Sequence, residues 1–426
     1  MALNSELLAQ TEQAVHDFGA WLDRFGEVSQ DHQDYYTWSI GRWCKRQYYR
    51  NKKYGTFLVA PFVFCEAFLP RTRGLFRKKT RLPIGDAHYA MAFSYMYRLT
   101  GKKPYHQRAA HFLDMLEHSR CPAYQNHAWG YPFHWETVYG TWREGTPMIT
   151  ATPYCYDAFA DVYAVDSNPR WRAVMESTAR HVANDFNEVE LEPGVRVCSY
   201  TPGDDRRVVN ANSYRAQTLT RAASELDRED YWEIAQGNLN YVLGAQSPDG
   251  SWIYATDGLG SFIDNFHTCF VLKHLARIHA LRQPSGVWEA IEKGCEYYFE
   301  NLLDESQLPI PFAKPPRLIV YKRELYDYAE AINLALLLRD QIPKWNEVLE
   351  RLLQDLLVRW RKPDGSFRSR ELRFGWDNCP MHRWAQSQLF RALTLVLLVE
   401  KGGQRVPHTA VPERAYSLSH ELSESP

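Results

Sequence analysis

No run of 18 or more apolar residues occurs in the sequence, so no segment is long enough to cross a bilayer as a helix. The eight cysteines are scattered and include no C-x-x-C pair, which predicts reduced, mostly buried thiols rather than a disulfide framework. The start of the chain is amphipathic and carries acids, and it lacks the basic and apolar regions of a secretory signal. We therefore expect a cytoplasmic protein.

The net charge of -1 argues against a nucleic acid or another polyelectrolyte as a partner of the whole surface. The cysteines and histidines form no convincing ligand set for zinc, so we expect no metal. No motif calls for a redox cofactor, and we expect none. These absences leave a soluble globular protein that acts with its own side chains.

Aromatic residues are abundant: 14 Trp, 26 Tyr and 20 Phe make up 14% of the chain. Packing in a core could use all of them. Many, however, stand in connectors rich in Gly and Pro rather than in periodic helices, for example in residues 129–136. Rings beside polar groups are typical of sugar-binding clefts, because the C–H face of a pyranose stacks on them.

Two kinds of helix alternate along the chain. Residues 343–360 carry one apolar stripe with i, i+3, i+4 spacing, whereas residues 331–338 are apolar nearly all round. A helix of the second kind must be buried on every side. The buried helices are predicted to begin near residues 86, 152, 211, 264, 325 and 381. The one-sided helices are predicted at about 103–119, 168–186, 228–245, 286–302, 343–360 and, to close a ring, 5–25.

This alternation predicts an all-α fold, an (α/α)6 toroid with short β-hairpin connectors. An open α-solenoid is the alternative, but its repeats are commonly about 34–47 residues long, shorter than those here. We expect a single toroid over residues 1–401, with a basic and apolar insertion at about 42–81. Residues 402–426 form a polar tail that we expect to be disordered.

All inner helices of such a toroid run the same way, so their N-termini gather at one mouth. That mouth collects positive dipole ends and free N–H groups, which favour anionic or hydroxyl-rich ligands. Polar residues at the starts of the inner helices are therefore the first candidates for a site.

Asp264 and His267 open the fourth inner helix, where Asp264 is predicted to act as a general acid or base and His267 to share its proton. The alternative is that Asp264 is only the N-cap of that helix. Asp86, at the start of the first inner helix, is predicted as a second catalytic carboxylate.

Arg383, if buried, needs a carboxylate partner, for which Asp264, Asp327 or a substrate carboxylate would serve. The complete predicted substrate-binding set consists of Trp129, Tyr131, Trp135, Glu136, Tyr200, Asn210, Asn212, Tyr214, Trp252, Asn265, Asp327, Tyr328, Arg383, Trp384 and Gln386.

Residues 42–81 hold twelve Lys and Arg against one acid, Glu66. Between the two basic runs lies the apolar stretch 56–69. Basic flanks around an apolar segment could rest on an anionic membrane surface, which would make the protein peripheral to the inner membrane, or meet a polyanionic glycan. The alternative is a buried helix with solvated ends.

With these motifs in hand, the chain resembles the VpsJ-like (α/α)6-toroid proteins of bacterial polysaccharide and capsule biosynthesis clusters. The stretches that carry the resemblance are GTPMITAT (145–152), CSYTPGDDRRVVNAN (198–212), QSPDGSW (246–252), IDNFHT (263–268) and RWAQ (383–386). More distantly it resembles unsaturated glucuronyl hydrolases and the helical domain of glucuronyl C5-epimerases. The resemblance implies a carbohydrate-active protein. An Asp-x-His expected near the fifth inner helix is replaced here by Asp327-Tyr328-Ala329.

Two functions of different classes follow. The first is a glycoside hydrolase, lyase or epimerase that acts by carboxylate acid/base chemistry on an oligo- or polysaccharide, one that could carry uronic acids. The second is a non-catalytic glycan-binding or scaffold protein of a membrane-associated polysaccharide assembly machine, docked through residues 42–81.

Overall fold

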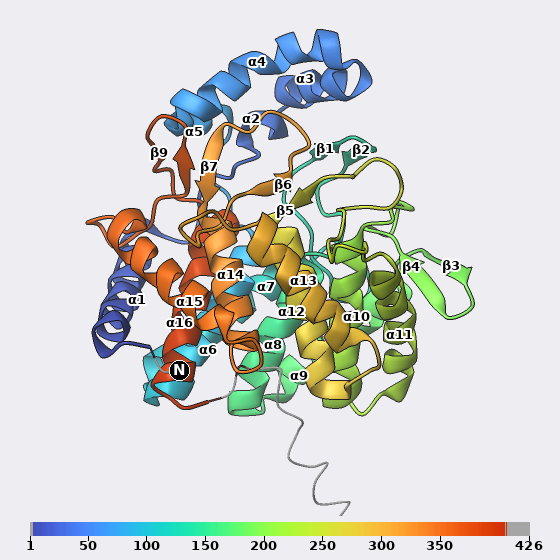
Figure 1. The fold of residues 1–426 in the computed structure, drawn as a ribbon, viewed down its shortest axis with the longest axis vertical. Helices are drawn as coiled ribbons and strands as arrows, with labels where there is room; N and C mark the ends of the chain where they lie inside the picture. Colours follow the sequence, from blue (N-terminus) through green and yellow to red (C-terminus); the bar gives the residue numbers. More distant parts are fainter. Residues whose placement is uncertain (1–2, 405, 407–426) are drawn as a thin grey trace, which may run out of the picture.

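The computed structural model describes residues 3–404 and 406. Six inner helices surround a central axis, and each contacts the next around the ring. The last of them also contacts the first, so the ring is closed (Figure 1). They are α6 (Pro83–Thr100), α8 (Thr152–Asp166), α10 (Val209–Glu225), α12 (Asn265–Arg282), α14 (Leu325–Leu338) and α16 (Ser387–Glu400).

Outer helices cover this ring, and each is paired with an inner one. They are α7 (Lys103–His118), α9 (Pro169–Asn184), α11 (Glu229–Gly244), α13 (Val287–Asn301), α15 (Lys344–Asp355) and α1 (Ser5–Phe25). As predicted, α1 takes the sixth outer place, since it packs against both α16 and α15. The prediction of an (α/α)6 toroid is thus confirmed.

The largest departure from the predicted helix starts is at the last inner helix. Regular helix begins there at Ser387 rather than near residue 381, because a π-helical turn, His382–Gln386, precedes it. The backbone of Trp384 in this turn is not helical (φ -114°, ψ 41°). A short π-helical turn, Leu356–Trp360, likewise continues α15.

The interior of the ring contains charge as well as apolar side chains. Lys273 on α12 and Glu330 on α14 are both fully buried and form an ion pair across 2.5 Å. Arg277 on α12 pairs with Asp157 on α8 at 3.2 Å, also in the interior. Burying charges is costly unless they are paired, so these contacts tie α12 to its neighbour α14 and, across the interior, to α8.

Short antiparallel strands connect the helices, as predicted. The hairpins β1 (Trp135–Thr137)–β2 (Gly140–Trp142) and β3 (Glu188–Glu192)–β4 (Val195–Cys198) are local. Two further pairings join connectors that are distant in sequence: β5 (Ile263–Asp264) with β6 (Phe312–Lys314), and β7 (Tyr321–Glu324) with β8 (Arg370–Leu372). On its other side β8 pairs locally with β9 (Trp376–Asp377).

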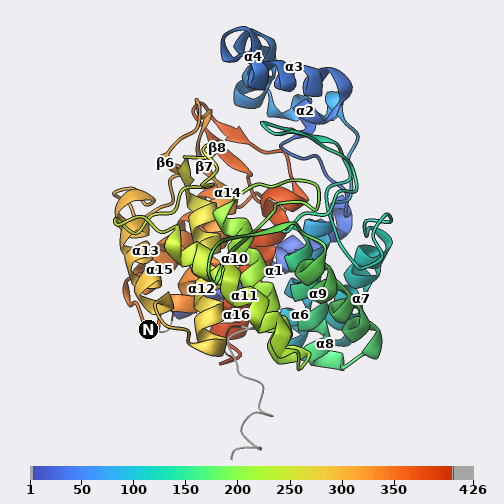
Figure 2. The same ribbon diagram turned by 90° about the vertical axis from the view of Figure 1, so that its right-hand side faces the viewer.

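Residues 34–76 form a helical layer across the end of the toroid at which the inner helices begin (Figures 1 and 2). Its elements are α2 (Asp34–Thr37), α3 (Ser39–Arg50), α4 (Lys52–Phe68), a 3-10 turn (Pro70–Thr72) and α5 (Arg73–Phe76). In α4 only Gly55 and Val59 are buried, so the expectation of a buried helix here is wrong. Among the described residues, no helix is both long and apolar enough to cross a membrane.

Buried ion pairs hold this layer to the toroid. Arg73 on α5 contacts Asp377 on β9 at 2.6 Å, and both side chains are fully buried. Glu66 on α4 contacts Arg370 on β8 at 2.7 Å. Arg46 and Arg81 also form ion pairs, with Glu136 and Asp86, so several basic residues of 42–81 pair with acids of the rest of the fold. Apart from residues 402–404 and 406, the predicted tail lies outside the described residues.

We expect Arg73→Met to lower the free energy of unfolding by about 3–5 kcal/mol, because the substitution leaves the carboxylate of Asp377 buried without its cation. Urea denaturation of purified protein measures the change. The matched double variant Arg73→Met/Asp377→Asn removes both charges and should restore most of the loss. A loss below about 1 kcal/mol in the single variant would show that this pair does not anchor the layer.

Candidate active site

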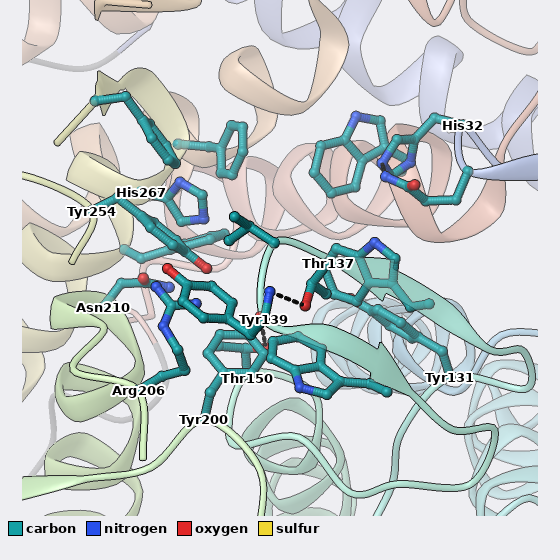
Figure 3. A pocket seen from close by; sticks show the side chains of 18 of the residues that line it. His32, Tyr131, Thr137, Tyr139, Thr150, Tyr200, Arg206, Asn210, Tyr254 and His267 are labelled. Carbon is teal, nitrogen blue, oxygen red and sulfur yellow. Dashed lines mark hydrogen bonds between the residues drawn. The ribbon is translucent and has the colours of Figure 1, made fainter. Parts of the chain in front are cut away.

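A cavity of about 330 Å³ opens at the end of the toroid where the inner helices begin. Every inner helix contributes to its lining from the first turns or from the turn that precedes them, for example Tyr154 on α8 and Phe270 on α12. The helical layer also contributes, with Lys45, as does the β1–β2 hairpin. Figure 3 shows Thr137 of this hairpin at the cavity. The cavity thus lies at the mouth where helix dipoles and free N–H groups converge.

The structure brings eight of the predicted site residues together around this cavity. Asn210 among them has a buried side-chain oxygen with no hydrogen-bond partner in the described protein, and it could accept a bond from a sugar hydroxyl. The eight are Tyr131, Trp135, Tyr200, Asn210, Tyr214, His267, Arg383 and Trp384.

Two tryptophans predicted to stack on sugar lie in the core instead. The indole N–H of Trp129 donates to the carbonyl of Leu116 at 2.8 Å, and that of Trp252 donates to the carbonyl of Val242 at 2.9 Å. Both side chains are buried and neither lines the cavity. Each anchors a connector against a helix, which an aromatic residue in a turn can do as well as it can line a cleft.

Four other predicted residues bond to the protein and lie outside the cavity lining. The side-chain oxygen of Asn212 accepts from the backbone N–H of Cys198 at 2.8 Å. Asn265 donates to carbonyls of the β6 connector, and Gln386 both donates to and accepts from the backbone of Phe367. The hydroxyl of Tyr328 donates to Asp355 on the outer helix at 2.8 Å.

The predicted carboxylates Glu136, Asp86 and Asp327 are also outside the lining. Glu136 on β1 accepts from Arg46 on α3 at 3.0 and 3.1 Å, which ties the hairpin to the helical layer. Asp86 accepts from Arg81 at 2.8 Å, although burial raises the pKa of its carboxyl to about 7.

Asp327 is fully buried near two other acids. Burial raises the pKa of Asp327 well above its ordinary value, and the negative charges of Glu324 and Asp264 raise it further. Burial and the neighbouring acids therefore both favour the neutral form of this carboxyl.

Asp264 and His267 meet at the start of α12. The carboxylate of Asp264 caps the helix, because it accepts from the backbone N–H of His267 at 3.3 Å, and it also contacts Nδ1 of the His267 ring at 2.7 Å. The Asp264 side chain is buried, whereas 21% of the His267 side chain is exposed. Asp264 is therefore the N-cap of α12 and also contacts the imidazole at the cavity wall, while its role as a general acid or base stays a prediction.

Stacked rings form the walls around His267. Tyr326 and Trp384 are parallel with centroids 4.6 Å apart, and Trp142 stacks on Tyr200 at 4.7 Å. The ring of Tyr254 lies 4.7 Å from that of His267. Figure 3 shows the two side chains beside each other. Such surfaces suit the apolar face of a sugar ring, while the phenol hydroxyls and Asn210 are available for its hydroxyl groups.

Arg383 forms a buried pair with Asp31 rather than with the predicted Asp264 or Asp327. Its guanidinium donates to both oxygens of Asp31, at 2.8 and 2.7 Å, and to the hydroxyl of Tyr131 at 3.0 Å. The Arg383 charge holds the pKa of Asp31 well below its ordinary value even though that carboxyl is buried. The positive charge of Arg383 is therefore compensated within the protein.

Three further cations line the cavity that sequence reasoning did not single out: Lys45, Arg206 and Arg317. Arg206 pairs with Asp257 at 2.5 Å, but Lys45 and Arg317 have no acidic partner within 4.0 Å among the described residues. Burial, together with the positive charge of Arg317, lowers the pKa of Lys45 to about 7. An excess of positive charge thus faces the cavity.

No aspartate or glutamate belongs to the cavity lining within the described part of the chain. Asp264, the predicted catalytic acid, contacts His267 and is not itself part of the lining. In the same residues, no group of three or more His, Cys, Asp or Glu side chains is placed to hold a metal ion. The side chains of the lining that can transfer a proton are histidine, lysine and tyrosine.

Comparison with known proteins shows the fold. An unsaturated glucuronyl hydrolase from a Bacillus species superposes with a TM-score of 0.62 at 10% identity, covering 96% of this chain and 100% of that one. A cellobiose 2-epimerase from Bacillus thermoamylovorans superposes at 0.58 with 10% identity, covering 74% and 87%. A D-mannose isomerase superposes at 0.57 with 13% identity, covering 74% and 86%. No family model and no curated protein sequence matches the chain.

We expect the ammonium group of Lys45 to titrate near pH 7 instead of above pH 10, because it is buried and faces Arg317. A protein labelled with 13C-lysine allows its Cε resonance to be followed by NMR against pH, with Lys45→Met used for assignment. Arg317→Ala removes the repelling charge and should move the midpoint up, whereas Glu136→Gln removes an attracting one and should move it down. A midpoint above about 10 in the wild type, the ordinary lysine value, would contradict this account of the surroundings of Lys45.

Proposed function

We propose that this protein is a carbohydrate-active enzyme that moves a proton on a bound sugar, as an epimerase, isomerase or lyase does. The observation that carries the proposal is the Asp264–His267 pair. The buried carboxylate holds Nδ1 of the ring at 2.7 Å, which leaves Nε2 as the nitrogen that meets a ligand in the cavity. A histidine oriented in this way by a carboxylate is suited to general acid/base catalysis.

Hydrolysis with two carboxyl groups fits the cavity less well. Glycoside hydrolases flank the scissile bond with two carboxyl groups roughly 5–9.5 Å apart. In the described residues the lining contains no carboxylate, and the predicted second acid, Asp86, is held by Arg81 outside it. Proton transfer through an imidazole needs no such pair.

The charge of the cavity supports a sugar that carries or develops negative charge. When a base removes a proton from carbon next to a carbonyl or carboxylate, the electron pair moves onto oxygen. Lys45 and Arg317 line the same cavity without acidic partners, so they can stabilise that oxygen or a uronate group. The stacked rings and Asn210 would orient the sugar. A role in polysaccharide biosynthesis and a cytoplasmic location, peripheral to the inner membrane, stay predictions.

Solvent exchange tests the proposal directly. Neutral and uronic-acid mono- and oligosaccharides are incubated with the protein in D2O, and deuterium entering a carbon position is followed by 1H NMR. The wild type should exchange a proton of at least one sugar, and His267→Asn should bind that sugar but exchange it about 10²–10⁴-fold more slowly.

Asp264→Asn tests the orientation of the His267 ring by the carboxylate while it keeps a cap on helix α12. Asparagine caps a helix as well as aspartate does, so the free energy of unfolding should change by less than about 0.5 kcal/mol. Exchange should nevertheless fall at least about 100-fold, because the amide no longer holds the reactive form of the ring. Full activity of this variant would refute the assignment. Binding by all three proteins without exchange in any of them would instead favour a non-catalytic glycan-binding protein.

A further inference from the structure

A second and larger cavity adjoins the first. It measures about 750 Å³ and runs as a groove between α4 and the connector 316–321. Its walls are mostly apolar and include Val63, Phe64 and Phe68 from α4 and Leu318 and Phe374 from the facing connectors. We call it the apolar groove.

The apolar groove is left open to solvent. The exposed fraction is 55% for Phe64, 78% for Leu318 and 77% for Phe374. Large apolar side chains gathered at one place on a surface mark a site that binds an apolar partner. The rest of α4 adds to this surface, since Phe57 is 79% exposed.

The apolar groove and the cavity of the candidate active site meet at three residues that line both: Lys45, Tyr49 and Arg317. Two cations therefore stand where the apolar and the polar compartments join, without an acidic partner within 4.0 Å in the described residues. Glu66 also lines the groove, but Arg370 neutralises it at 2.7 Å. Each cation at the junction repels the other, and an anion bound between them would remove that repulsion.

We propose that the substrate is a saccharide joined through phosphate to a lipid chain, with the chain in the apolar groove, the phosphate between Lys45 and Arg317, and the sugar beside His267. The placement of the sugar rests on the function proposed above. The lipid chain, the phosphate and the sugar match the apolar groove, the junction and the cavity of the candidate active site, which adjoin one another in that order.

Other occupants match only part of the site. A free polyanionic glycan would use the two cations but leave the apolar groove empty. A flat membrane surface could meet the exposed rings of α4, but it would not reach a junction that lies between two cavities. A phosphate ester pairs well with lysine and arginine, and arginine can bind it through two parallel hydrogen bonds.

Calorimetry with farnesyl phosphate, its neutral alcohol farnesol and inorganic phosphate tests the lipid and phosphate parts without a sugar. Farnesyl phosphate should bind at least about tenfold more tightly than farnesol, since hydrogen bonds to charged groups add to the apolar contact. Inorganic phosphate alone should bind much more weakly. Farnesol and farnesyl phosphate binding with equal affinity would overturn the assignment of the junction.

Variants separate the contribution of the phosphate to binding from that of the lipid chain. Arg317→Ala, on an exposed connector, should weaken farnesyl phosphate about tenfold and leave farnesol unchanged. Val63→Trp fills the groove and should weaken both at least about tenfold, while Lys53→Ala, on α4 but outside the groove, should change neither. Binding unaffected by Val63→Trp would show that the lipid binds elsewhere. Binding only to vesicles of anionic lipid, lost on adding salt, would show surface adsorption instead.

The same preparations, assayed for deuterium exchange into free sugars, separate the two proposals. Exchange without any binding of farnesyl phosphate would overturn the proposal of a lipid-linked substrate but would support the proposed enzyme activity. Groove-dependent binding of farnesyl phosphate would support the lipid site even if no free sugar exchanged, and in that case only the proposed chemistry would fall.

Discussion

The buried ion pair between Arg383 and Asp31 is the contact on which the arrangement of the mouth depends. Arg383 stands in the turn before the last inner helix, and Asp31 stands in the connector that leaves the first outer helix. The pair therefore ties the early and the late part of the chain together beside the cavity, where α1 and α16 close the ring. It also places Trp384 against His32 and directs the hydroxyl of Tyr131 toward the guanidinium. A buried pair of this kind contributes a specific geometry more reliably than it contributes stability.

Ion pairs between buried arginines and carboxylates also hold the helical layer to the toroid. Arg73 and Arg370 are buried arginines that each reach an acid across the boundary between layer and toroid. The layer brings Lys45 and Tyr49 over the mouth and gives the apolar groove one of its walls. The two cavities thus depend on ion pairs that hold the helical layer to the toroid, together with the aromatic packing of Phe62 on α4 within the layer. The exposed rings of α4 remain available for a ligand for the same reason.

The toroid could be predicted from the sequence because helical periodicity is a local property. An all-round apolar stretch such as 331–338 has to be surrounded, and its regular alternation with one-sided helices leaves few arrangements other than a ring. The start of α12 was predictable in the same way, which is why Asp264 and His267 were found. Trp129 and Trp252 were misplaced, because an aromatic residue in a turn has the same sequence signal whether it faces the core or the cavity. Lys45 and Arg317 could not be found as a pair, since their meeting depends on how α3 of the helical layer and the distant connector 316–321 fold over the mouth.

Closure of the ring by α1 and α16 has a consequence for the order in which the molecule can be made. The inward face of α1, with Ala14, Phe18 and Leu22, is covered in part by α16, which begins only at Ser387. A nascent chain therefore carries this apolar face uncovered while nearly all of the other hairpins are being synthesised. Contacts between residues so far apart in sequence form slowly, and uncovered apolar surface invites association in the meantime. Protection of α1 during translation, by the ribosome surface or by a chaperone, is thus a requirement that the closed ring places on the cell that makes it.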